Sequence, residues 1–294
     1  MKYYRLLAAL LFVPWLPLFA QVSVEVDLEQ QEFLPGETLP VTVRIVNRSG
    51  QTLTLGRDPE WLTFSVEARG DFIVIKNGDA PVEGGFQVGS SQMATKHVDI
   101  APYFVLTRQG RYNVTATVRL KDWDTQVTSK PKTFDVIDGA KLWSREFGVP
   151  IKSGPTNQPP EVRRFTLEQA NYLRSQLRLY LRLTDASDTR VIKVFAIGPM
   201  VSFGQPEAQM DRECNLHVLY QTGAKSFNYT VCNVDGTLLV RQRYDYTATR
   251  PRLQVDERGN ITVTGGARRV TSADLPPPPP PPVIDTTTPL VPPR

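Results

Sequence analysis

The sequence has few of the residue types that carry catalysis or metal binding, since its 294 residues include only two histidines and two cysteines. His97 lies two residues before Asp99, but the serines nearby lack the Gly-x-Ser-x-Gly elbow of a hydrolase nucleophile. Cys214, His217 and Cys232 supply three zinc ligands where a structural site needs four. No Gly-x-Gly-x-x-Gly or other phosphate-cradling loop precedes an expected helix. We therefore expect no enzyme activity, and no catalytic, cofactor-binding or metal-binding residues.

The two cysteines suit an oxidising compartment and could form a disulfide. Cys214 lies just before a predicted hairpin over residues 216–233, and Cys232 lies near its end. If its four-residue loop sets the register, Leu216 lies opposite Val231, and the sulfurs of Cys214 and Cys232 point to opposite faces. A β-bulge would bring them to the same face. The sequence leaves both outcomes open.

Long apolar runs are also scarce, and the longest opens the chain. Residues 1–20 contain Lys2 and Arg5, then an apolar run from Leu6 to Ala20, which together are typical of a signal peptide. The run is shorter than the roughly 20 residues that span a bilayer. We expect export, with a secreted or periplasmic product that has no membrane span after signal removal. The net charge of +4 is too small to favour nucleic acid as a partner.

Residues 21–138 alternate apolar and polar side chains in several short runs, for example 22–28, 41–45 and 112–118. Such a period of two indicates half-buried antiparallel strands. Turn residues separate the runs, as in Leu34-Pro35-Gly36-Glu37. A segment of this length can enclose one core, which predicts a β-sandwich.

Two motifs in this segment are informative about its family. Residues 106–116, Leu-Thr-Arg-Gln-Gly-Arg-Tyr-Asn-Val-Thr-Ala, resemble the tyrosine corner before a late strand, and residues 33–50 resemble an early strand and turn. With these motifs the segment resembles bacterial extracytoplasmic immunoglobulin-like and macroglobulin-like modules. The resemblance implies that the hydroxyl of Tyr112 is tied to nearby backbone. It implies a fold and no ligand, since such modules serve as spacers, adhesin parts, assembly modules and protease inhibitors.

Residues 139–165 have a different composition, with prolines at 150, 155, 159 and 160. We expect an interdomain linker there. A short helix is expected next, because Thr166 and Gln169 fit a capping box and Leu167, Ala170 and Leu173 recur at helical spacing. From Leu177 onward the period changes to two.

The C-terminal half contains an internal echo at a shift of 45 residues. The segment 206–218 (PEAQMDRECNLHV) reappears as 251–263 (PRLQVDERGNITV). Together with a hairpin echo at a shift of 48, this predicts two units, 178–221 and 227–266, each similar to a propeller blade. Two blades cannot close a ring, so we expect an open sheet, a compact sandwich or a piece completed by another chain.

The predicted fold is thus all-β: an immunoglobulin-like sandwich over 21–138, and an antiparallel β-meander module over 166–270 with two blade-like repeats and one short helix. Residues 271–294, which include seven consecutive prolines from 276 to 282, are expected to be a disordered Pro-rich tail.

The best candidate for a binding surface is a stretch in which basic and aromatic residues alternate, because arginine and tyrosine dominate the energetics of many interfaces. Its members are Arg241, Arg243, Tyr244, Tyr246, Arg250 and Arg252.

The leading hypothesis is an exported, non-enzymatic binding or envelope-assembly protein whose partner is a protein or glycan of the cell envelope. One alternative is an extracytoplasmic carbohydrate-active enzyme or carbohydrate-binding protein, which a pocket with convergent acids would favour. The other alternative is a protease inhibitor. The sequence sets no oligomeric state.

Overall fold

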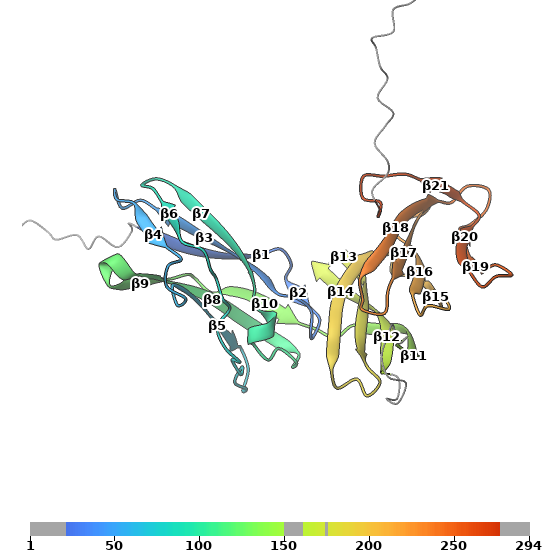
Figure 1. Cartoon of the computed structure of the whole chain (residues 1–294), viewed down its shortest axis with the longest axis horizontal. Helices are drawn as coiled ribbons and strands as arrows, with labels where there is room; N and C mark the ends of the chain where they lie inside the picture. Colours follow the sequence, from blue (N-terminus) through green and yellow to red (C-terminus); the bar gives the residue numbers. More distant parts are fainter. Residues whose placement is uncertain (1–21, 150–160, 174–175, 277–294) are drawn as a thin grey trace, which may run out of the picture.

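The computed structural model describes residues 22–149, 161–173 and 176–276, and in this part of the chain the fold is all-β, as predicted. Two β domains lie side by side, with the N-terminal domain at the left of Figure 1 and the C-terminal domain at the right. The described residues include no helix with the length and apolar character needed to cross a bilayer. The expected signal peptide (1–20) and the proline run of the tail from Pro277 onward lie outside the described residues.

The N-terminal domain contains ten strands and two short 3-10 helices. These are β1 (Val22–Leu28), β2 (Glu32–Phe33), β3 (Pro40–Asn47), β4 (Leu53–Leu55), β5 (Leu62–Ala68), β6 (Phe86–Val88), β7 (Met93–Asp99), η1 (Ala101–Tyr103), β8 (Gly110–Leu120), η2 (Lys121–Trp123), β9 (Thr125–Thr128) and β10 (Lys132–Val136). They form a β1-β3-β7 sheet, a β2-β10-β8-β5 sheet with β9 beside β8, and a small β4-β6 pair.

The alternating residues of these strands make one core. In β3 every second residue, from Val41 to Ile45, is buried against the alternating residues Val114, Ala116 and Val118 of β8. Tyr112 at the start of β8 is fully buried, and its hydroxyl donates a 2.6 Å hydrogen bond to the backbone carbonyl of Arg108. This is the bond expected of a tyrosine corner.

The C-terminal domain contains eleven strands within the described residues. These are β11 (Ala140–Gly148), β12 (Val162–Leu173), β13 (Gln176–Asp185), β14 (Val191–Pro199), β15 (Glu207–Met210), β16 (Leu216–Gln221), β17 (Ser226–Cys232), β18 (Leu238–Asp245), β19 (Arg252–Val255), β20 (Ile261–Thr264) and β21 (Ala267–Arg269). A β11-β12-β13-β14 sheet, which we call the inner sheet, packs on a β15-β16-β17-β18-β21 sheet, which we call the outer sheet, and β19-β20 form a separate pair.

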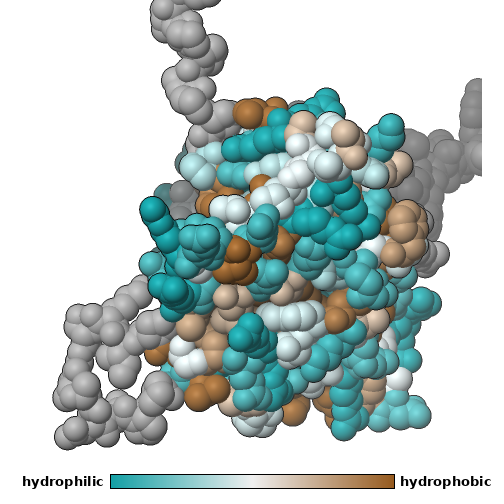
Figure 2. Space-filling model, turned by 90° about the vertical axis from the view of Figure 1, so that its right-hand side faces the viewer, coloured by the Kyte–Doolittle hydropathy of each residue, from teal (hydrophilic) through white to brown (hydrophobic). Residues whose placement is uncertain are grey.

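Two apolar clusters hold these layers together. Between the inner and outer sheets lie Leu167, Leu181 and Leu183 from one side and Leu216 and Val218 from the other. On the opposite face of the outer sheet, the β19-β20 hairpin packs over a second cluster. The surface at this end of the molecule is mainly hydrophilic, with apolar residues scattered among polar ones (Figure 2).

The helix expected after Thr166 is wrong, because these residues belong to strand β12. β12 is a central strand, paired with β11 and β13, and it buries side chains on both faces. Phe165 and Leu167 face the outer sheet, whereas Ala170 packs toward the N-terminal domain. Apolar residues on two faces break the period of two and produced the misleading helical spacing.

The expected linker over 139–165 is also wrong in its described part. Residues 140–148 form β11, which pairs antiparallel with β12 from Gly148 opposite Val162 to Ala140 opposite Gln169. The prolines lie in 150–160, which is outside the described residues and connects two strands of one sheet. The junction between the domains is instead the short segment 137–139, between β10 and β11.

The echo at 45 residues corresponds to two alike hairpins, β15-β16 and β19-β20. In each turn the first Asp accepts hydrogen bonds from the backbone N–H groups two and four residues later, and the fourth residue has a left-handed backbone. The acceptors are Asp211 and Asp256, and the left-handed residues are Cys214 (φ 62°) and Gly259 (φ 82°). The sequence repeat is therefore a repeat of turn chemistry.

The predicted units contain the expected strands, yet neither unit is a single blade. In the first unit β13 and β14 belong to the inner sheet, and β15 and β16 belong to the outer sheet. In the second unit β18 pairs with β21 instead of β19. The connections 200–206 and 246–251 allow each second hairpin to leave its sheet, so the domain is a layered sandwich.

The predicted β16-β17 register is off by one residue. Leu216 lies opposite Cys232, and Val231 lies opposite His217. Both cysteines are free thiols: Cys232 is buried between the sheets, and Cys214 lies in the β15-β16 turn with its Sγ 3.5 Å from the carbonyl oxygen of Gly148.

The start of the expected tail is ordered. Leu275 exchanges two backbone hydrogen bonds with Arg241 of β18, each 2.9 Å. Asp274 is buried and accepts a 2.7 Å hydrogen bond from Arg268. Residues 271–276 therefore belong to the C-terminal domain.

Candidate functional site: a pocket between the two domains

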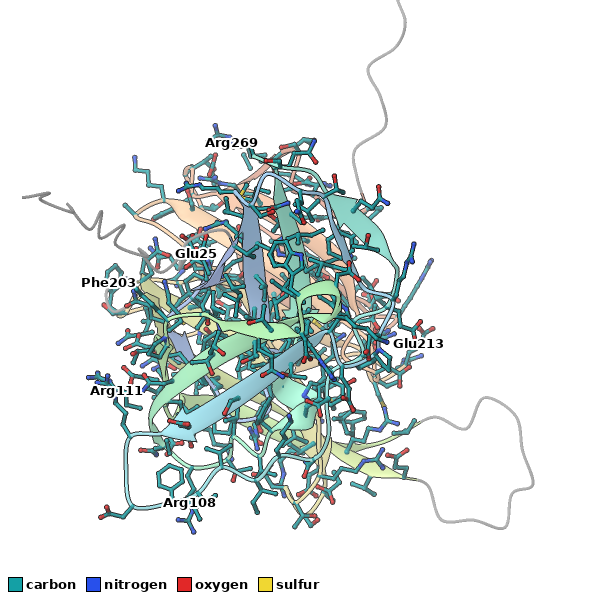
Figure 3. The ribbon with its side chains drawn as sticks, turned by 90° about the vertical axis from the view of Figure 1, so that its left-hand side faces the viewer. Glu25, Arg108, Arg111, Phe203, Glu213 and Arg269 are labelled. Carbon is teal, nitrogen blue, oxygen red and sulfur yellow. The ribbon has the colours of Figure 1, made fainter. Side chains whose placement is uncertain are left out.

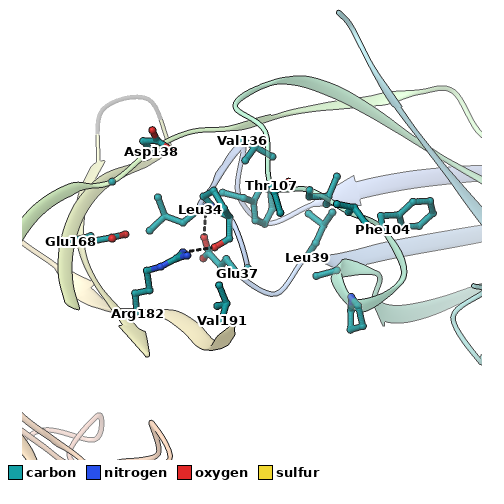
Figure 4. Close-up of a pocket in the computed structure, with 18 of the residues that line it drawn as sticks. Leu34, Glu37, Leu39, Phe104, Thr107, Val136, Asp138, Glu168, Arg182 and Val191 are labelled. Carbon is teal, nitrogen blue, oxygen red and sulfur yellow. Dashed lines mark hydrogen bonds between the residues drawn. The ribbon is translucent and has the colours of Figure 1, made fainter. Parts of the chain in front are cut away.

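A pocket of about 670 Å³ lies where the two domains meet (Figure 4). The β2-β3 turn of the N-terminal domain forms one wall, and β12, β13 and the β13-β14 turn of the C-terminal domain form another. Apolar side chains, among them Leu39, Phe104 and Val136, line the part toward the N-terminal domain. Pockets at domain junctions are frequent ligand sites in proteins.

The β2-β3 turn reaches the C-terminal domain because of its sequence. Pro35 and Gly36 occupy its two central positions, Gly36 has φ +84°, and the N–H of Glu37 donates a 3.0 Å hydrogen bond to the carbonyl of Leu34. A Cβ at Gly36 would lie 2.8 Å from Cγ1 of Val191, so only glycine allows this approach.

Leu34, the first residue of the turn, is buried against Ala170, Tyr180 and Val194 of the inner sheet. Arg182 adds a polar contact, since its Nη1 donates a 2.9 Å hydrogen bond to the carbonyl of Pro35. These contacts join the domains at the base of the pocket.

Glu37 is the most buried acid of the pocket, with 8% of its surface exposed. Its carboxylate accepts hydrogen bonds from the side chain of Gln30 (3.0 Å) and from the backbone of Leu34 (2.9 Å). Burial outweighs these bonds and raises the pKa of Glu37 to about 6.

The C-terminal wall carries the other charges. Burial raises the pKa of Glu168 in β12 above its ordinary value, although Arg182 opposes the shift. Nε of Arg182 lies 3.6 Å from the carboxylate of Asp188. Together with Asp138, whose carboxylate accepts a hydrogen bond from Gln109, four acids and one arginine line the pocket.

This lining suits a ligand that presents a cationic or hydrogen-bond-donating group beside an apolar portion. Carboxylates accept hydrogen bonds from ammonium and guanidinium groups, and partial burial strengthens these contacts. In the part of the chain that the structure describes, no group of three or more His, Cys, Asp and Glu side chains has the spacing of a metal site.

The binding surface predicted from the sequence does not form one patch. On β18, Arg241 and Arg243 alternate with Tyr244, which packs edge-on to Tyr229 on the β19-β20 side of the outer sheet. Arg250 lies over the ring of Phe227 at 5.2 Å.

The two remaining predicted residues lie elsewhere. Tyr246 is exposed after the end of β18, and Arg252 pairs at 3.2 Å with Glu207. Alternation along one strand therefore divides the predicted group between two faces.

Sequence reasoning missed the pocket residues Glu37, Glu168 and Arg182. Glu37 stood in a recognised turn, but nothing in the sequence places that turn against a second domain. Glu168 and Arg182 lie in β12 and β13, and one of these strands was taken for a helix. Their shared face becomes visible only through the β12-β13 register, in which Glu168 lies opposite Tyr180 and Thr166 opposite Arg182.

No protein-family model matches the chain, and no curated protein matches it in sequence. Among solved structures, the sporulation control protein Spo0M from Bacillus subtilis is matched at 11% identity with a TM-score of 0.29, over 55% of this chain and 79% of that chain. A similarity this low carries no conclusion about function.

Proposed function

We propose that the protein is an exported, non-enzymatic binding or envelope-assembly protein, and that its partner is an envelope protein that places a basic side chain in the pocket between the domains. The observation that supports this proposal is the lining of the pocket, with four carboxylates against one guanidinium. The apolar residues beside them suit the aliphatic stem of lysine or arginine.

We also propose that the N-terminal domain is an immunoglobulin-like or macroglobulin-like module. The buried Tyr112 and its hydrogen bond to Arg108 support this proposal. Modules of this kind serve as spacers and assembly parts, which agrees with a role in binding.

The test is differential capture of partners from an envelope extract by the tagged mature chain. The wild-type chain is compared with the double variant Glu168→Gln, Asp188→Asn and with a charge-matched control, Glu213→Gln, Glu257→Gln, whose sites are exposed turns of the C-terminal domain. We expect a basic protein that wild type and control retain, that the pocket variant loses, and that high salt weakens. Equal recovery by the pocket variant, or a column without any partner, would contradict the proposal.

A second candidate is a carbohydrate-active enzyme, and a specific observation favours it. Glu37 and Glu168 line the same pocket and both have raised pKa values, as a general acid requires. Release of reducing ends from a panel of polysaccharides, abolished in Glu168→Gln, would support this candidate. Absence of release, or equal release by the variant, would remove it. The protease-inhibitor hypothesis stays a prediction.

A further inference from the structure

The C-terminal domain contains a second cluster of charged residues, separate from the pocket, on the face of the outer sheet that turns toward the inner sheet. In the register of the strands, Asn228 lies opposite Arg243, and Arg243 lies opposite Arg269 of β21. In the next row, Thr230 lies opposite Arg241. Directly opposed residues of an antiparallel pair share a face, so these side chains lie together.

The cluster runs from the buried interior to the surface. Thr230 is fully buried, whereas the side chain of Arg243 is 39% exposed and that of Arg269 is 61% exposed. Arg269 lies at the upper rim of the molecule in Figure 3. A ligand can therefore reach the arginines from solvent.

Several polar atoms of the cluster are buried without a hydrogen-bond partner among the described residues. They are Oγ1 of Thr230, Nε of Arg241 and Nε of Arg243, the last of which has the Asp245 carboxylate at 3.7 Å, beyond hydrogen-bond distance. A buried donor without a partner costs about 1 to 3 kcal/mol, so three at one place indicate a missing acceptor. Arg243 retains one hydrogen bond, from Nη2 to the hydroxyl of Ser226 at 2.8 Å.

The charges in this cluster are unbalanced. Among the described residues, Arg243 and Arg269 share the carboxylate of Asp245, which lies 3.7 Å from each, and Arg241 has no ion-pair partner. Like charges directly opposite each other on neighbouring strands are destabilising. The neighbouring Arg268 is already paired with Asp274 at 2.7 Å.

The charge of Arg241 acts on the interior face of the sheet. It lowers the pKa of the Tyr220 hydroxyl and of the Cys232 thiol, although burial dominates and raises both. Tyr220 and Cys232 belong to the core between the two sheets. Arg241 therefore lies toward the inner sheet, as the register indicates.

We propose that Arg241 and Arg243, with Thr230 behind them, form a binding site for a tetrahedral oxyanion, a phosphate or sulfate group. Residues two apart on a strand lie about 6.6 Å from each other, and one such anion can bridge two guanidinium groups at N–H···O distances of about 2.8 Å. The open Nε–H donors match the bidentate way in which arginine holds these anions. This site does not depend on the function proposed for the interdomain pocket.

The test is a calorimetric titration of the full mature chain with inorganic phosphate and with sulfate, and with acetate as a planar anion. We expect saturable binding of the tetrahedral anions, weakened about tenfold or more by Arg241→Gln or Arg243→Gln. The matched control is Arg258→Gln, which removes one positive charge from the exposed β19-β20 turn and should leave affinity within about twofold.

The lysine variants Arg241→Lys and Arg243→Lys keep the charge and remove the bidentate fork, so we expect intermediate affinity. If circular dichroism shows that a glutamine variant is unfolded, the lysine variant at the same position is used for the titration instead. Wild-type affinity in both lysine variants, equal loss in Arg258→Gln, tighter binding of acetate, or no saturable binding by wild type would each overturn the proposal.

Discussion

The contribution of a single residue to the stability of this protein depends on its location in the fold, which the amino-acid composition does not indicate. Glu37 is one acid among many in the sequence, but its place under the domain junction removes it from water. The folded state therefore holds its proton more tightly than the unfolded chain does, since the pKa rises from 4.5 to about 6.

This shift gives the first prediction. Because the folded pKa of Glu37 is raised, its contribution to stability is present below pH 4.5 and is lost as the pH rises through about 6, by about 2 kcal/mol in total. In urea unfolding, the stability at about pH 8 relative to that at about pH 4 should therefore be higher in Glu37→Gln than in wild type by about 2 kcal/mol. The exposed control Glu25→Gln should follow wild type, and an unchanged pH dependence in Glu37→Gln would refute the assignment.

Tyr112 gives the second prediction. Tyr112→Phe keeps the buried ring and removes the hydrogen bond to the carbonyl of Arg108. We expect a loss of about 1 kcal/mol in the free energy of unfolding, measured by urea denaturation. Tyr246→Phe, at an exposed position, serves as the control and should be neutral. A neutral Tyr112→Phe would mean that the corner is held by packing alone.

At the scale of elements, the two related turns differ in what surrounds them. Both Asp211 and Asp256 cap their turn, but only Asp211 also holds His217, through a 3.1 Å contact to Nε2. The other ring nitrogen of His217 bonds the hydroxyl of Tyr229 at 2.7 Å. Burial acts to raise the pKa of Asp211, yet the hydrogen bonds from Asn215 and His217 keep this pKa below its ordinary value.

We therefore predict that the two turns respond unequally to the same substitution. Asp211→Ala should cost about 2 kcal/mol of folding free energy, because it removes charge-assisted bonds and leaves Nε2 of the buried His217 without its partner. Asp256→Ala, in the exposed turn, should cost less. Thermal unfolding of both variants checks this order, and an equal or larger loss in Asp256→Ala would contradict it.

The elements also show what the sequence could predict. Strands with one solvent-facing side, such as β3 and β8, follow the period of two and were predicted from it. The turns around Asp211 and Asp256 were predictable as well, because each contains the Asp that caps it. β12 was mistaken for a helix because residues such as Phe165 and Ala170 are buried on opposite faces. The pocket was not predictable, since Glu37, Glu168 and Arg182 come together only when two domains dock.

At the scale of the whole molecule, the domains are joined through a small apolar contact around Leu34. Leu34→Ala should create a cavity there and weaken docking by about 2 to 3 kcal/mol, while each domain retains its own core. We expect calorimetry to resolve two unfolding transitions, one for each domain, in the Leu34→Ala variant. In wild type the two transitions should lie closer together, because the docked domains stabilise each other. Gly36→Ala should act in the same direction, because its Cβ would collide with Val191.

The matched control is Leu239→Ala, at an exposed position of β18, which should leave the melting profile unchanged. Identical calorimetric profiles for Leu34→Ala and wild type would show that the turn does not hold the domains together.

The junction at 137–139 has a mechanical consequence. β10 leads almost directly into β11, so one extended stretch of backbone is a strand in both domains, and the N–H of Ile137 is bonded to the carbonyl of Phe33 beside it. Tension applied to one domain would pass along this stretch into the centre of the other, without a slack tether to absorb it. Such a molecule would extend little under load before one of its domains unfolds.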